Sequence, residues 1–277
     1  MDFDYIPCTV ASESIDDDLL ECTMEGCDCD GECTAASFCP CILSSMDNYD
    51  EEGRLEDGRE SDSSPLLECH DSCGCVASGC RNRRVQFGVK RRVEIRPSEG
   101  KGMGLFAVEN IGRGEFVCEY AGEMISKEEV ERRKAEEGGS RQHNYVLTVK
   151  EHCAGDTVHT WFIDPSRKGN IGRFCNHSCN PCLGVVVLRV GTTAPIVGLF
   201  ALRYPRLSLK SQSSTSISNF RPISLTSSVY KVFEKILIKK ITTFHISHSH
   251  NYFAHCEFFY RLPVLSSMVT FFYFNYS

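Results

Sequence analysis

Cysteines are the residues of this chain best able to bind a ligand. The chain has 277 residues and 17 Cys, nine of which form two compact runs. The first run is Cys27-x-Cys29-x3-Cys33-x5-Cys39-x-Cys41, and the second is Cys69-x3-Cys73-x-Cys75-x4-Cys80. Thiolates at this spacing can converge on tetrahedral Zn²⁺ at about 2.3 Å each. Nine sulfurs can saturate three zinc ions if three of the sulfurs are shared between ions.

Two alternatives to a metal cluster follow from the cysteines themselves: unrelated buried thiols, or disulfides in an exported protein. The first residues, Met1-Asp2-Phe3-Asp4, are acidic and lack the basic and apolar segments of a secretory signal. We therefore expect a reducing compartment, in which clustered cysteines bind metal. No run of 18 apolar residues occurs, so no membrane-spanning helix is expected. Cys8 and Cys22 lie outside the two runs and are expected to bind no metal.

Net charge divides the chain into an acidic first quarter and a basic remainder. Residues 1–68 hold 20 Asp/Glu and two Lys/Arg, a balance of −18, whereas the whole chain carries −7. An acidic block usually indicates a solvated or partly disordered segment. The cysteines argue against that interpretation here, except for residues 46–65, which are rich in Asp, Glu, Gly and Ser and contain no Cys. We expect those residues to form a flexible excursion between two halves of one zinc unit.

A second group of motifs follows the cysteines. It comprises Gly100-Lys101-Gly102-Met103-Gly104, Glu119-Tyr120-Ala121-Gly122-Glu123, Asn144-Tyr145 and Gly169-Asn170-Ile171-Gly172-Arg173-Phe174-Cys175-Asn176-His177-Ser178-Cys179-Asn180-Pro181. A glycine-rich turn between strands lets a ligand approach the backbone closely. Taken singly, the first motif could be just a tight turn, and the last could be a polar turn or a Cys-His site. Their order and spacing remove most of that ambiguity.

The cysteine spacing, which ends in Cys80-Arg81-Asn82, resembles the pre-SET triple-zinc cluster of Su(var)3-9-type histone lysine methyltransferases, and the later motifs resemble the SET domain. The resemblance implies transfer of a methyl group from S-adenosyl-L-methionine to a lysine of histone H3. It implies a partner in the H3 tail or nucleosome, and a location in the nucleus on the chromosome. It also implies three Zn²⁺ ions, with Cys27, Cys33 and Cys69 as the bridging sulfurs. Neither membrane association nor direct sequence-specific DNA binding is indicated.

The resemblance also assigns residues to the active site. It implies that the backbone of Lys101, Gly102 and Met103 holds the methionine end of the cofactor. It further implies that Tyr145 and Arg173 line the cofactor pocket and that Asn176 and His177 contact the amino and adenine groups. Tyr120 is implied to be catalytic, because it lines the channel in which the lysine amine meets the methyl group. Met103 stands where the family usually has Trp, so this aromatic wall is lost.

The elements that must position these residues are mainly short β-strands. Alternating apolar runs of four to six residues, separated by Gly or Asn, predict a β-fold with few helices and with the zinc cluster packed against the SET sheet. Ser126-Lys127-Glu128-Glu129 is a capping box and predicts a helix start. The expected order is an acidic segment over 1–24, the pre-SET cluster over 25–84 and the SET domain over 85–203.

The family pattern stops at Arg203. A Gly-Glu-Glu-Leu turn and a second catalytic tyrosine are expected after it, but Tyr204-Pro205-Arg206 follows. The SET domain is therefore predicted to be truncated before the strand that closes its pseudoknot. Cys179 is predicted to be an orphaned post-SET ligand, and the post-SET zinc to be absent. Activity is expected to be impaired, and the alternative is a catalytically inactive chromatin-associated zinc module or an incomplete gene product.

The rest of the chain does not follow the family. Residues 204–218 are predicted to be a Ser-rich linker. Within residues 219–277, Asn219–Ser227 and Lys231–Leu237 resemble the start of a non-LTR retrotransposon reverse transcriptase, without its catalytic Asp-Asp motif. We expect this tail to be poorly ordered.

Overall fold

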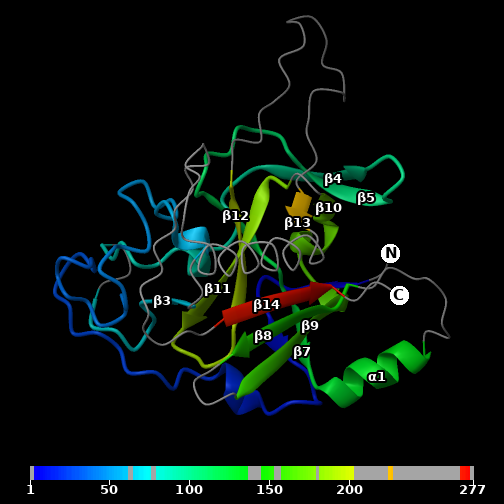
Figure 1. Cartoon of the computed structure of the whole chain (residues 1–277), viewed down its shortest axis with the longest axis horizontal. Helices are drawn as coiled ribbons and strands as arrows, with labels where there is room; N and C mark the ends of the chain where they lie inside the picture. The colour runs from blue at the N-terminus through cyan, green and yellow to red at the C-terminus, as the bar shows by residue number, and fades with distance from the viewer. Residues whose placement is uncertain are drawn as a thin grey trace, which may run out of the picture.

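The computed structural model describes residues 3–61, 65–75, 79–136, 145–152, 157–178, 181–202, 224–226 and 269–274. The fold is mainly β, as the sequence predicted (Figure 1). Among the described residues, the one α-helix is α1 (Lys127–Glu136). Short 3₁₀ turns connect the strands: η1 (Asp17–Leu20), η2 (Arg59–Ser61), η3 (Val85–Phe87) and η5 (Ile171–Phe174). None of the helices in these ranges is long and apolar enough to cross a membrane.

Sheet 1 carries the Tyr145 side of the site. Its strands follow the order β14 (Val269–Phe274), β8 (Leu147–His152), β9 (Val158–Gly169), β7 (Gly122–Ile125) and β2 (Val10–Ala11), and β1 (Asp4–Tyr5) pairs with β9. Alternate residues of β8 and β9 face inward, so that Leu147, Val149 and Ile163 are fully buried. This period of two fixes the register of β8 against β9.

Sheet 2 carries the Asn-His-Ser motif at its edge. Its order is β10 (Asn176–Ser178), β13 (Ser224–Thr226), β11 (Leu183–Val190), β12 (Ile196–Ala201) and β6 (Phe116–Glu119), and β3 (Leu66–Glu68) pairs with β11. A separate hairpin joins β4 (Val93–Pro97) to β5 (Met103–Ala107). The two sheets share one apolar core, in which Leu147 and Ile163 of sheet 1 lie in the same cluster as Val117 and Leu199 of sheet 2.

Helix α1 is fixed to sheet 1 by its cap and by a buried arginine. The Ser126 hydroxyl accepts a hydrogen bond from the Glu129 backbone N–H at 3.1 Å, which confirms the predicted N-cap. Arg133 is buried, and its Nη1 donates to Glu123 at 2.9 Å and to Asp164 at 2.8 Å. Because these carboxylates lie on β7 and β9, the helix holds both strands in place.

Residues 46–61 differ from the flexible excursion that their composition suggested. Tyr49 and Leu55 are buried in a cluster with Leu66, Leu188 and Phe200. The Tyr49 hydroxyl lies 2.5 Å from Glu68 Oε1. A few apolar side chains are thus enough to pack this acidic stretch against sheet 2, because Tyr49 and Leu55, which pair in a β-bridge, also reach distant strands.

The tail beyond Leu202 is described only at two strands. β13 pairs in parallel with β10, with Leu225 opposite His177, and β14 pairs antiparallel with β8. The interpretation of residues 204–218 as a linker, and of the remaining tail as poorly ordered, lies otherwise outside the described residues, as does Cys179. Among the described strands, β10 is joined to sheet 2 through β13. The strand with Asn176 and His177 therefore has a partner, although the sequence predicted that its closing strand was lost.

Candidate active site and zinc cluster

The nine clustered cysteines come together in space, although 27 residues separate the two runs. Eight of the nine are buried. The Sγ atoms of Cys27 and Cys33 are 3.8 Å apart, those of Cys27 and Cys69 are 3.9 Å apart, and those of Cys41 and Cys73 are 3.8 Å apart. A tetrahedron with metal–sulfur bonds of about 2.3 Å has edges of about 3.8 Å, so these separations suit Zn²⁺.

Three groups of four sulfurs lie close enough to hold a metal ion: Cys27, Cys29, Cys33 and Cys39; Cys27, Cys41, Cys69 and Cys73; and Cys27, Cys33, Cys69 and Cys75. Cys27, Cys33 and Cys69 each occur in more than one group. The Cys80 thiol makes hydrogen bonds with the thiols of Cys69 and Cys33, so it lies close to both. The bond with Cys69 raises the pKa of Cys80. The donor set therefore fits a cluster in which ions share ligands.

The electrostatics of the sulfur cluster favour a bound cation. Burial raises the pKa of the Cys33 thiol, and the neighbouring Cys69 raises it further. Burial also raises the pKa of Cys39, to about 11. In contrast, Cys27 has its pKa lowered to about 6, because hydrogen bonds from the Cys29 backbone and from Cys33 outweigh its burial. Crowded thiols cannot all ionise without a compensating positive charge, which Zn²⁺ supplies.

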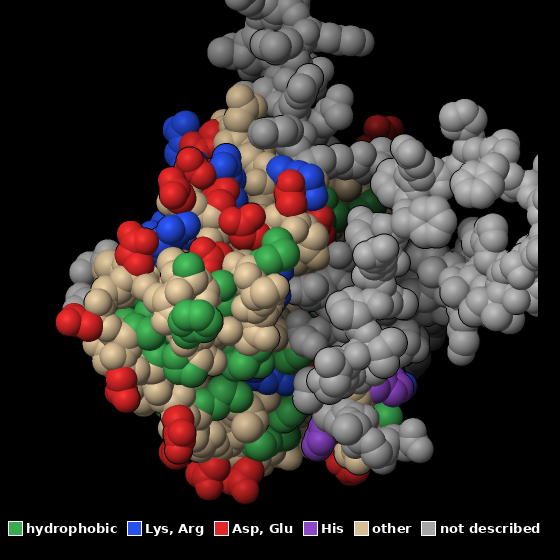
Figure 2. Space-filling view, turned by 60° about the vertical axis from the view of Figure 1, so that its left-hand side comes forward, with side chains coloured by type: hydrophobic (Ala, Val, Ile, Leu, Met, Phe, Trp, Pro, Cys, Tyr) green, Lys and Arg blue, Asp and Glu red, His purple; other side chains and the backbone are tan. Residues whose placement is uncertain are grey.

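The surface near the loop-rich side of the molecule is mostly acidic. Figure 2, which turns this side forward, shows Asp and Glu side chains spread over the face, with apolar side chains between them. Phe38, Leu43 and Met46 are among the exposed apolar residues of the cysteine region. The acidic side chains agree with the charge asymmetry of the sequence.

Tyr120 lies at the centre of the site. It is 4% exposed, and its hydroxyl donates to the backbone carbonyl of Tyr145 at 2.7 Å. Burial raises its pKa well above the ordinary value, and the nearby Cys175 adds to this effect. A Cβ atom on Gly172 would lie 2.7 Å from the Glu119 carbonyl oxygen and 3.2 Å from Tyr120 Cα, so only glycine allows this close approach.

The glycine-rich turn and the Asn-His-Ser strand meet on one side of the site. Lys101 donates from Nζ to the His177 carbonyl at 2.7 Å, and Asn176 Nδ2 lies 3.4 Å from the Met103 carbonyl. Gly102 has φ +68°, a left-handed conformation that side chains rarely adopt. The structure thus brings Lys101, Gly102, Met103, Asn176 and His177 together, although more than 70 residues separate the two segments.

Arg173 packs against the aromatic rings of Tyr145 and Phe3. Its guanidinium carbon lies 4.5 Å from the centre of the Tyr145 ring and 4.2 Å from that of Phe3. The residue is 8% exposed, and among the described residues its Nε and Nη1 have no hydrogen-bond partner. A buried guanidinium with unused donors is costly on its own, so the site fits a ligand that carries an anionic group.

Several residues of the site were not found from the sequence. Phe3 contacts Arg173 and also packs edge-on against Phe174, with ring centres 5.9 Å apart. The buried Glu119 accepts hydrogen bonds from the backbone N–H of Thr9 at 2.9 Å and from the Thr9 hydroxyl at 2.6 Å. Asn170 caps η5 and donates to the Glu119 carbonyl at 2.9 Å. Asn170 could have been found as a capping residue before a turn, whereas Phe3 and Thr9 carry no local signal.

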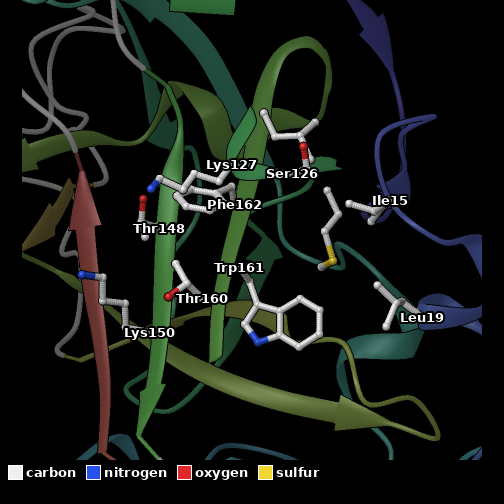
Figure 3. A pocket seen from close by; sticks show the side chains of 11 residues that line it. Ile15, Leu19, Ser126, Lys127, Thr148, Lys150, Thr160, Trp161 and Phe162 are labelled. Carbon is white, nitrogen blue, oxygen red and sulfur yellow. The ribbon is translucent and has the colours of Figure 1, made fainter. Parts of the chain in front are cut away.

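A cavity of about 630 Å³ lies where β7 ends and α1 begins, and none of the predicted site residues lines it. Ser126, Lys127, Thr148, Lys150 and Phe162 are among the side chains around it, and Trp161 points toward Leu19 across it (Figure 3). Thr148 is 4% exposed, and its hydroxyl has no partner among the described residues. The Trp161 indole N–H is already used, since it donates to Glu151 at 2.7 Å.

A cluster of nine mostly buried cysteines, two sheets around one core and a glycine turn facing an Asn-His-Ser strand together define the class of pre-SET and SET lysine methyltransferases. Comparison with known proteins supports this. A family model described as the SET domain matches residues 102–205, and one described as the Pre-SET motif matches residues 1–83. The probable histone-lysine N-methyltransferase set-23 of Caenorhabditis elegans is 42% identical over 207 residues, covering 73% of this chain and 82% of that protein.

Solved structures agree. The methyltransferase domain of human histone-lysine N-methyltransferase SETMAR matches with a TM-score of 0.66 and 31% identity, over 82% of this chain and 91% of that one. KRYPTONITE in complex with mCHH DNA, an H3(1–15) peptide and SAH matches with a TM-score of 0.57 and 26% identity, over 73% of this chain and 39% of that one. The chain belongs to the histone-lysine N-methyltransferase family with pre-SET and SET domains.

Proposed function

We propose that this protein uses S-adenosyl-L-methionine to methylate a lysine of the histone H3 tail, in the nucleus on chromatin. The observation that carries the proposal is the buried guanidinium of Arg173, which has unused donors and stacks on Tyr145. Tyr120 and the Lys101–Met103 turn, which Lys101 joins to His177, belong to the same proposed site. The KRYPTONITE structure, in which an H3 peptide and SAH are bound to a related fold, supports both the substrate and the cofactor.

The cofactor supplies an activated methyl group, so the protein has to position the lysine amine and keep water out. Tyr120 suits this role, because its hydroxyl is fixed by the bond to the Tyr145 carbonyl. Its raised pKa keeps the hydroxyl protonated at neutral pH, so Tyr120 orients the amine rather than acting as a base. The lysine must lose a proton from an ordinary pKa of about 10.4, and burial in an apolar channel lowers that value.

In this proposal the cavity beside α1 receives the peptide that flanks the target lysine. Thr148 and Lys150 line it from β8, the strand that begins two residues after Tyr145. The unpartnered Thr148 hydroxyl offers a hydrogen bond to such a peptide. The lysine channel and the cavity would then lie along one strand.

We also propose three zinc ions in the cysteine cluster, with Cys27, Cys33 and Cys69 shared. The recurrence of these three residues among the four-sulfur groups supports this assignment. No post-SET zinc is proposed, because the sequence after Cys182 offers only Cys256 as a further cysteine.

We propose that turnover is slow compared with relatives that carry the second tyrosine. The sequence after Arg203 lacks that residue, and misplacing a reacting atom by about 1 Å can cost on the order of 100-fold in rate. The lack of this second tyrosine also favours a second candidate function, a catalytically inactive chromatin-associated zinc module.

One experiment separates the two functions. Binding of SAH is measured by calorimetry, and methyl transfer from labelled cofactor is measured on H3 peptides and nucleosomes, beside the human SETMAR methyltransferase domain. We expect binding with transfer that is about 100-fold slower, abolished by Tyr120→Phe and unchanged by Tyr5→Phe, an exposed tyrosine. Transfer within about tenfold of the relative would refute the impairment, and binding without any transfer would favour the inactive module.

A further inference from the structure

The segment of residues 3–12 lies along the SET domain and is held at several points. β1 pairs with β9 through Asp4 and Tyr5, and the Ile6 N–H donates to the Gly169 carbonyl at 2.9 Å. Further along, Thr9 binds Glu119, and β2 pairs with β7. We call this segment the arm. Its contacts fix its register against the strands that flank Tyr120.

The register places one aromatic residue of the arm against the site. Phe3 lies with its ring 4.2 Å from the Arg173 guanidinium carbon and packs edge-on against Phe174. Tyr145 contacts the same guanidinium at 4.5 Å, and the Phe174 ring centre lies 5.6 Å from it. Phe3 and Tyr145, which lie 142 positions apart in the sequence, thus both stack on Arg173. Arg173 is buried and leaves Nε and Nη1 without partners among the described residues.

We propose that Phe3 is a positioning residue of the cofactor site: its ring holds the Arg173 guanidinium in place so that this group donates to the carboxylate of S-adenosyl-L-methionine. This inference rests on the proposed function. The carboxylate is the one anionic group of that cofactor, and a guanidinium that is already held in a fixed plane loses less conformational freedom when it binds a carboxylate. The two ring contacts fix that plane without using the donors.

The glycine-rich turn from Gly100 to Gly104 contains no aromatic residue. The arm supplies one, because the Phe3 ring contacts the Arg173 guanidinium. A segment outside the SET motifs is thereby made part of the active site.

The test compares Phe3→Leu and Phe3→Tyr in the full, zinc-loaded chain. Leucine keeps an apolar side chain but has no ring to stack on Arg173, whereas tyrosine keeps the ring. Affinity for SAH and for decarboxylated SAH is measured by calorimetry. We expect Phe3→Leu to weaken SAH binding about 3- to 30-fold, the range that a cation–π contact contributes, and Phe3→Tyr to bind as the wild type does. Neither change should alter binding of decarboxylated SAH.

The matched control is Tyr5→Leu, on the same arm, where the side chain is 61% exposed. It should leave SAH affinity unchanged. Unchanged or tighter SAH binding by Phe3→Leu would overturn the clamp, as would an equal loss for SAH and for its decarboxylated form. An equal loss in Tyr5→Leu would show a general effect of the arm and would also overturn it. A wild-type chain that binds no SAH would refute the proposed function itself, and the clamp with it.

Discussion

The cysteine region and the SET sheets form their cores by different chemistry. In the first, the buried cluster consists of eight cysteines with Ile42, and Cys29 and Ala35 pack against it. In the second, Leu105, Leu147, Ile163 and Leu199 are buried among other apolar side chains of both sheets. Apolar burial stabilises the sheets without help, whereas crowded thiols repel one another once they ionise and need a cation. We therefore expect the cysteine region to fold with a bound cation, whereas the sheets fold around their own side chains.

Removal of metal is the strongest test of this difference. A chelator should unfold the cysteine region and spare the sheets, since structural zinc contributes on the order of 10 kcal/mol to the folding of a small domain. Hydrogen exchange read by mass spectrometry should show loss of protection between Cys27 and Cys80, with Leu147 and Ile163 still protected. An equal loss of exchange protection in both regions would show that the two cores do not differ in their dependence on metal.

A point variant makes the same test at one sulfur. Cys69→Ser should release more than one of three zinc ions, because Cys69 belongs to two of the four-sulfur groups. Cys8→Ser, at an exposed cysteine outside the cluster, should release none. Metal analysis of the purified variants gives the result, and a stoichiometry of one zinc or none in the wild type would refute the three-ion cluster.

A cavity made in the apolar core of the sheets should lower the unfolding free energy without releasing zinc. Leu199 is 0% exposed on β12, so Leu199→Ala should cost about 2–5 kcal/mol of unfolding free energy while the zinc content stays the same. Val158→Ala, at a position 43% exposed on β9, serves as the control and should cost much less. Denaturant titration gives the energies, and zinc loss in Leu199→Ala would show that the regions are not independent.

β13 tests whether the tail contributes to the site. Leu225→Pro removes a backbone donor from the strand that pairs with Asn176 and His177. SAH affinity should fall about 3- to 10-fold, since one hydrogen bond contributes about 0.5–1.5 kcal/mol. Zinc content should not change, and Ser224→Ala, which keeps every backbone group, should bind SAH normally. Unchanged affinity in Leu225→Pro would show that β10 does not depend on β13.

The smallest expected effect concerns Glu119. Burial raises its pKa, and the two hydrogen bonds from Thr9 only partly offset this. An acid whose pKa is raised on folding favours the native state at low pH and loses that contribution as the pH rises through the folded-state pKa. Glu119→Gln stays neutral at every pH, so its stability relative to the wild type should increase from pH 5 to pH 8. A pH-independent difference would argue against a raised pKa.

Local patterns in the sequence predicted the parts of the molecule that depend on local spacing. The cysteine cluster, the Ser126 cap and the site residues from Lys101 to His177 all carry short motifs. Phe3 and Thr9 act through partners more than 100 residues away, and Arg133 reaches Asp164, which lies 31 residues away, so no spacing rule reveals these contacts. The packing of Tyr49 was missed because acidic composition outweighed one buried aromatic residue, and β13 was missed because the family pattern ends before it.

The chain has a single tryptophan, Trp161, which lies on β9 of sheet 1 with its indole N–H bound to Glu151. Its fluorescence therefore reports on the SET sheets and is blind to the sulfur cluster. Conversely, the ultraviolet absorption of metal–thiolate bonds would come from the cluster alone. Each half of the protein thus has its own optical signal, and the two unfolding curves can be recorded from one sample without any label.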